Sequence, residues 1–140
     1  MAVELFNAVW ALLEKENRNC AENDRMIHAA HASRFHWEIA GQPINWGIGE
    51  WQVSRVHAVM KQQDTALYHA WRYLEIAEDY SLGPFHVAYA HEAVARAFAI
   101  NDPAKAAEHI AKARAHGGKI EDPEERELLE KDLGTIVAAE

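Results

Sequence analysis

The chain has 140 residues, of which 49% are hydrophobic and 26% are charged, a balance typical of a single globular domain built around one core. Its 14 basic residues face 22 acidic ones, and the resulting formal charge of −8 argues against nucleic-acid binding by phosphate neutralisation. No apolar run reaches the length of a membrane-spanning helix, and the first residues lack the pattern of a signal peptide. We therefore expect one domain over residues 1–140, located in the cytoplasm and binding neither nucleic acid nor membranes.

Residue usage favours helices along the whole chain. Alanine occurs 26 times and threonine twice, and apolar residues recur every three or four positions instead of alternating. Glycine and proline stand almost only between the periodic segments. The predicted fold class is therefore all-α, with about seven antiparallel helices stacked as helical hairpins.

Three helices are expected in the N-terminal part of the chain. The first runs from about Val3 to Arg18. Asn23 or Asp24 is the expected N-cap of the second, which continues towards the breaker sequence Gly41–Pro43. The third is predicted over Trp46 to Gln62.

Four further helices follow. Asp64–Thr65 are the expected caps of the fourth, which ends at Ser81–Pro84, and the fifth covers Phe85 to about Ile100. The sixth begins at Asn101–Pro103 and the seventh at Asp122–Pro123, because each stretch places an acidic cap before a proline whose missing N–H costs nothing. The seventh helix carries an apolar stripe of Leu129, Leu133 and Ile136.

Two stretches of the chain resemble each other. Residues 53–59 reappear in type as residues 94–100, and each stretch is followed, after a polar turn, by an alanine-rich helix. The repeating unit is therefore 40 or 41 residues long. Small residues occupy the matched positions Ser54 and Ala95, as two helices require where their axes cross closely.

This pattern resembles the tetratricopeptide-repeat family, whose helical pair has a large and then a small residue, an aromatic residue three positions later, and spaced alanines in its second helix. The better match consists of Val94, Ala95, Phe98, Asp102, Ala106, Ile110 and Ala113, with one residue missing from the turn. The looser match consists of Val53, Ser54, His57, Ala66 and Ala70. It departs from the family where His57 replaces an aromatic residue and Tyr73 a small one.

The resemblance covers residues 46–116 and implies a right-handed array with a C-terminal capping helix. Residues 1–45 could form a third pair, but their register is ambiguous. An unrelated α-helical bundle is the alternative.

The resemblance also implies a binding face, because the first helices of such repeats line a concave groove that takes peptides. Arg55 and Arg96 occupy matching positions in the two units, and Trp51, Tyr89 and Glu92 lie within two turns before them. We expect a protein or peptide ligand, including ligands with acidic groups, bound by the arginines and the aromatic rings. In the alternative, each arginine pairs with a nearby glutamate such as Glu92.

The nine histidines raise the question of a metal site. None has a glutamate three residues before it, as a di-iron bundle requires, and His91-Glu92 lacks the second histidine of a zinc-protease helix. The single cysteine cannot supply a thiolate-rich site. We predict a non-enzymatic interaction module without cofactor or metal. The alternative is a helical bundle with a small-molecule or metal site that uses His28, His31, His36 or His91. A homo-oligomer fits either interpretation.

Overall fold

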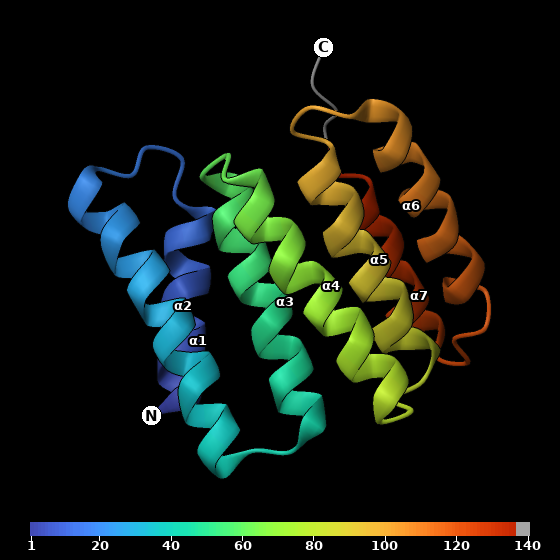
Figure 1. Ribbon diagram of the computed structural model, residues 1–140, viewed down its shortest axis with the longest axis horizontal. Helices are drawn as coiled ribbons and strands as arrows, with labels where there is room; N and C mark the ends of the chain where they lie inside the picture. Colours follow the sequence, from blue (N-terminus) through green and yellow to red (C-terminus); the bar gives the residue numbers. More distant parts are fainter. Residues whose placement is uncertain (137–140) are drawn as a thin grey trace.

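The computed structural model describes residues 1–136, which form seven α-helices joined by short turns (Figure 1). The helices are α1 (Ala2–Glu14), α2 (Cys20–Ala40), α3 (Pro43–Val59), α4 (Gln63–Asp79), α5 (Pro84–Phe98), α6 (Pro103–Gly117) and α7 (Pro123–Leu133). No strand occurs in this range, so the all-α prediction is confirmed. The last four residues of the predicted domain, 137–140, lie outside the described part of the chain. None of the seven helices combines the length and the apolar character needed to cross a bilayer.

The start of α2 differs from the prediction. Its N-cap is Asn19, four residues before the nearer predicted cap. The Asn19 side chain accepts the backbone N–H of Glu22 at 2.8 Å, and the Glu22 carboxylate accepts the backbone N–H of Asn19 at 3.1 Å. This reciprocal capping box satisfies two N–H groups that the first turn would otherwise leave unpaired.

Helix α3 also begins earlier than predicted, at Pro43 instead of Trp46. Two glycines, Gly47 and Gly49, lie in its first half. A Cβ atom on Gly47 would lie 2.8 Å from the Tyr73 ring, and one on Gly49 would lie 2.8 Å from the Arg34 side chain. These glycines are points of close approach between α3 and its neighbours α4 and α2.

The predicted caps of α4 are two to three residues late, since its N-cap is Gln62. Gly83, with φ of 99°, precedes α5 as its N-cap, whereas Ser81 carries the left-handed conformation after α4. The predicted starts of α6 and α7 are confirmed. Asp102 and Asp122 each accept a backbone N–H of the first turn, and each is followed by proline.

Consecutive helices pack together as the hairpins α1/α2, α3/α4 and α5/α6, followed by α7 (Figure 1). Each odd-numbered helix also contacts the next odd-numbered one. Helices α1, α3, α5 and α7 therefore make a continuous surface, here called the odd-helix face.

Burial in the even-numbered helices recurs every 40 residues. The recurring positions are Met26, Ala30 and Ser33 in α2, Ala66, Ala70 and Tyr73 in α4, and Ala106, Ile110 and Ala113 in α6. All are buried except Ile110, which is half-buried. The first hairpin therefore follows the same spacing as the other two, which the ambiguous register of residues 1–45 did not reveal.

Helix α7 covers the end of the array. Leu129 and Leu133 are buried, and Ile136 packs against the same core cluster, as the apolar stripe predicts. A Cβ atom on Gly117 would lie 2.5 Å from Leu129, so the end of α6 approaches α7 closely. The capping position predicted for the seventh helix is confirmed for residues 123–136.

Candidate functional site

The five residues predicted to bind a ligand lie together between α3 and α5. Trp51 donates its indole N–H to one oxygen of Glu92 at 2.8 Å. Arg96 donates to the other oxygen from Nη2 at 2.7 Å and from Nε at 3.0 Å, and Arg55 donates to that oxygen at 3.5 Å. The Tyr89 ring meets the Trp51 ring edge to face, with centroids 5.7 Å apart.

Glu92 is the centre of this cluster, and its side chain is fully buried. A buried carboxylate is tolerated only when donors replace the water it loses, and here four N–H groups do so. The arginines therefore pair with Glu92, as the alternative predicts, whereas ligand binding by these residues stays a prediction. The ion pairs fix both guanidinium groups on the odd-helix face.

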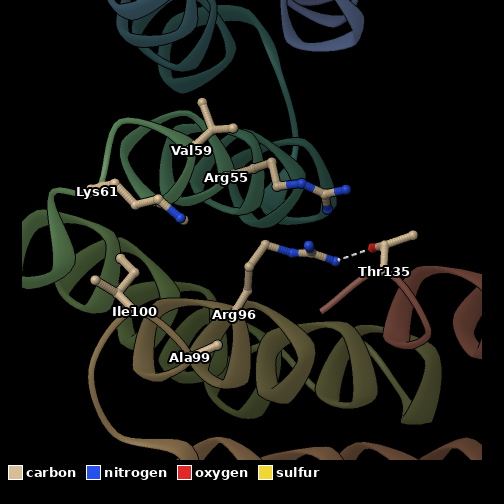
Figure 2. Close-up of a pocket in the computed structure, with 8 residues that line it drawn as sticks. Arg55, Val59, Lys61, Arg96, Ala99, Ile100 and Thr135 are labelled. Carbon is tan, nitrogen blue, oxygen red and sulfur yellow. Dashed lines mark hydrogen bonds between the residues drawn. The ribbon is translucent and has the colours of Figure 1, made fainter. Parts of the chain in front are cut away.

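Arg96 also connects α5 to the end of α7 (Figure 2). Its Nη2 donates to the backbone oxygen of Asp132 at 3.0 Å and to the Thr135 hydroxyl at 2.8 Å. Two turns closer to the start of α5, the Tyr89 hydroxyl donates to the Asp132 carboxylate at 2.6 Å. Burial and then this acceptor raise the pKa of the Tyr89 phenol well above its ordinary value, so Tyr89 is a permanent donor.

Arg55 is less well satisfied than Arg96. Its guanidinium lies 5.8 Å from the ring centroid of Trp10 and 5.9 Å from that of Trp51, and the 3.5 Å contact with Glu92 is its one hydrogen bond to the described residues. Burial, followed by repulsion from Arg96, lowers the pKa of Arg55 from its ordinary value. Its charge is therefore only partly balanced.

An aromatic cavity of about 300 Å³ lies on one side of the Glu92 cluster. Its lining consists of Trp10, Ile48, Trp51, Tyr73, Phe85, Tyr89, Leu128 and Asp132. The polar atoms of three lining rings have hydrogen-bond partners: Trp51 bonds to Glu92, Tyr73 bonds to His86 at 2.7 Å, and Tyr89 bonds to Asp132, which also lines the cavity. The rings therefore present mainly apolar surface to the cavity.

A basic pocket of about 230 Å³ lies on the other side of the cluster (Figure 2). It is lined by Arg55, Ala58, Val59, Lys61, Arg96, Ala99, Ile100 and Thr135. Lys61, in the turn between α3 and α4, was not among the predicted site residues. Its φ of 60° places it in the left-handed region, which the sequence does not signal for a lysine.

Trp10 was also missed as a site residue, although a signal for it exists. It stands 41 positions before Trp51, which stands 41 positions before Glu92, so the three residues occupy equivalent places on α1, α3 and α5. The Trp10 and Trp51 ring centroids are 5.4 Å apart. The 41-residue spacing, extended to the first helix, would have found it.

In the described part of the chain, the histidines lie mostly between adjacent helices, and none of them lines either cavity. His31 meets His57 with Nε2 atoms 2.9 Å apart, and His91 meets His109 with Nδ1 atoms 3.1 Å apart. No hydrogen bond of the described residues involves His28 or His36. Within residues 1–136, no three His, Cys, Asp or Glu side chains are arranged to hold a metal ion.

No protein-family model matches the chain, and neither a curated protein nor a solved structure matches it. Functional inference therefore depends on the two cavities and the cluster between them.

Proposed function

We propose that the protein is a non-enzymatic interaction module, similar to tetratricopeptide repeats, that binds a peptide segment of a partner along the odd-helix face. The observation that carries the proposal is the pairing of two cavities of different chemistry on this face. One is aromatic and the other is basic, and the Glu92 cluster separates them.

Three segments of the chain contribute to both cavities. Helix α3 contributes Trp51 to the aromatic cavity and Arg55 to the basic pocket. Helix α5 contributes Tyr89 and Arg96 in the same way, and the end of α7 contributes Asp132 and Thr135. The two cavities therefore follow each other along the odd-helix face, with the Glu92 cluster between them.

Their spacing suits an extended peptide. Trp51 and Arg55 are four residues apart, which is about 6 Å along a helix. Alternate side chains of an extended chain project on the same side about 7 Å apart. A peptide with an apolar residue and, two positions later, an acidic residue would place the first in the aromatic cavity and the second beside the arginines.

The experiment is selection from a random peptide library with the wild-type protein, followed by affinity measurement for the enriched peptides. We expect enrichment of an apolar residue two positions from an acidic one. Trp10→Leu and Arg55→Gln should each weaken binding by about 1–3 kcal/mol, with melting temperature measured alongside. Arg72→Gln, which removes an exposed arginine of α4, is the matched control and should bind normally. A library without enriched peptides, or peptides indifferent to both substitutions, would refute the proposal.

A further inference from the structure

Among the described residues, three cations and no carboxylate line the basic pocket. Arg55 from α3, Lys61 from the following turn and Arg96 from α5 all belong to this lining (Figure 2). Glu92 contacts two of these cations, and the Asp132 carboxylate also attracts Arg55, but neither acid is part of the lining. A ligand in the pocket therefore meets cationic side chains first.

Donors in the pocket also remain unused. Arg96 uses Nε and Nη2, and none of its hydrogen bonds with the described residues involves Nη1. Arg55 makes its single 3.5 Å contact. Lys61 makes no side-chain hydrogen bond or ion pair within residues 1–136. Three donor groups from three segments are therefore available to one ligand.

The ends of α3 and α5 also lie beside the pocket, and a helix C-terminus carries roughly half a negative charge. Counted together with Glu92 and Asp132, these ends bring the total charge around the pocket close to neutral. The carbonyls of Val56, Ala58, Ala97 and Phe98 accept backbone N–H groups of the turns. The case for an anion therefore depends on the cationic donors of the lining, which stand next to the apolar walls Ala58, Val59, Ala99 and Ile100.

We propose that the basic pocket binds a phosphate monoester. A carboxylate has two oxygens, which Arg55 and Arg96 alone can satisfy, whereas a phosphate monoester offers three and a charge near −2 at neutral pH. Lys61 supplies the third donor direction. The part of this inference that assigns the phosphate to a side chain of a bound peptide rests on the proposed function, while a small phosphate ester has the same chemistry.

The test compares methyl phosphate with acetate, which present the same methyl group on a different anion. Each is titrated at pH 7.5 and constant ionic strength, with backbone amide shifts of the pocket residues as the readout, because fixed salt removes differences in screening. We expect methyl phosphate to bind at least tenfold more tightly than acetate. Equal affinities for the two anions, or no binding of methyl phosphate, would overturn the proposal.

Variants assign the individual donors. Lys61→Asn suits the left-handed backbone and should weaken methyl phosphate binding at least fivefold while leaving acetate within twofold. Arg55→Gln should weaken both anions. Arg72→Gln removes one positive charge outside the pocket and should change neither. Methyl phosphate binding that is insensitive to Lys61→Asn would contradict the three-donor site.

Two monoesters distinguish the source of the phosphate. N-acetylphosphoserine amide has a peptide backbone, whereas glycerol phosphate has none. Tighter binding of the phosphoserine compound supports both the phosphate site and the peptide groove. Equal binding supports the phosphate site and counts against the proposed peptide function. Selected peptides that bind while both monoesters fail would leave the groove standing and overturn the phosphate site.

Discussion

The hairpins α3/α4 and α5/α6 share a backbone but place their buried acid differently. Glu50 and Trp51 of α3 correspond to His91 and Glu92 of α5, 41 positions later. In the hairpin α3/α4, Glu50 contacts Arg34 on α2 and His69 on α4. In the hairpin α5/α6, the acidic residue stands one position later in the repeat, which is about 100° around the helix axis, and it contacts arginines on the odd-helix face.

This difference separates a structural ion pair from a candidate binding site. The Glu50–Arg34 pair joins two neighbouring hairpins, and the Glu50–His69 pair joins the two helices of one hairpin. The Glu92 pairs position two guanidinium groups where a ligand can reach them. Because of this shift by one position, the buried acid of α3 faces α2 and α4, whereas the buried acid of α5 contacts arginines on the odd-helix face.

Removing each buried acid should have the largest effect, and an unequal one. Glu92→Gln leaves two arginines without a carboxylate and should lower the free energy of unfolding by about 3–5 kcal/mol. Glu50→Gln leaves one arginine, Arg34, without its carboxylate partner at 3.2 Å, so about 1–3 kcal/mol should be lost. Urea denaturation at pH 7 measures both. Equal losses of unfolding free energy would contradict the expected difference between the two acids.

Acidification should have the next largest effect, and its largest contribution from a histidine comes from the hairpin α5/α6. His69 donates to Glu50 at 2.5 Å, but the equivalent His109 meets another histidine, His91. Burial, followed by repulsion from His109, His116 and Lys112, lowers the pKa of His91 from 6.5 to about 4.

The folded protein therefore keeps His91 neutral at pH values where the unfolded chain binds a proton. Stability is full above pH 6.5 and falls as the pH drops from 6.5 towards 4. We expect His91 to account for a loss of about 2 kcal/mol between pH 7 and pH 4.5, after allowance for solvent screening. Urea denaturation at the two pH values measures it, with His91→Gln as the variant that should lose less.

The smallest effect is expected when the hairpin α5/α6 is given the acid–histidine pair of the hairpin α3/α4. His91→Glu places a carboxylate opposite His109, as Glu50 stands opposite His69. The pKa of His109, now lowered by burial and by nearby lysines, should rise, and stability near pH 5 should increase by about 1 kcal/mol. Proton NMR titration of the His109 ring gives the pKa. An unchanged or further lowered value would contradict the equivalence of the two positions.

The sequence alone predicts the parts of the fold that depend on local chemistry. An aspartate before a proline marks the starts of α6 and α7 because cap and proline act within one turn. The start of α3 is missed because the prediction assigns Pro43 to the breaker sequence after α2, whereas it is the first residue of α3. Gly47 and Gly49, inside α3, admit Tyr73 and Arg34, which are distant in sequence. Local signals cannot show such close approaches.

Some residues of the candidate site could likewise be predicted from the sequence, and others could not. Arg55 and Arg96 are predicted because the repeat spacing places them at matching positions. Asp132 and Thr135 are missed because the end of α7 reaches the groove only through the packing of α7 on α5. Residues that join a site from another helix carry no local pattern that announces them.

The bonds from Tyr89 and Arg96 to the end of α7 have a thermodynamic consequence. Asp132 and Thr135 line the two cavities and also anchor the capping helix. A ligand that prefers the state with α7 docked must strengthen that docking by the same factor by which docking strengthens the ligand, because such coupling is reciprocal. The docking free energy of the capping helix and the affinity for such a ligand are therefore thermodynamically linked.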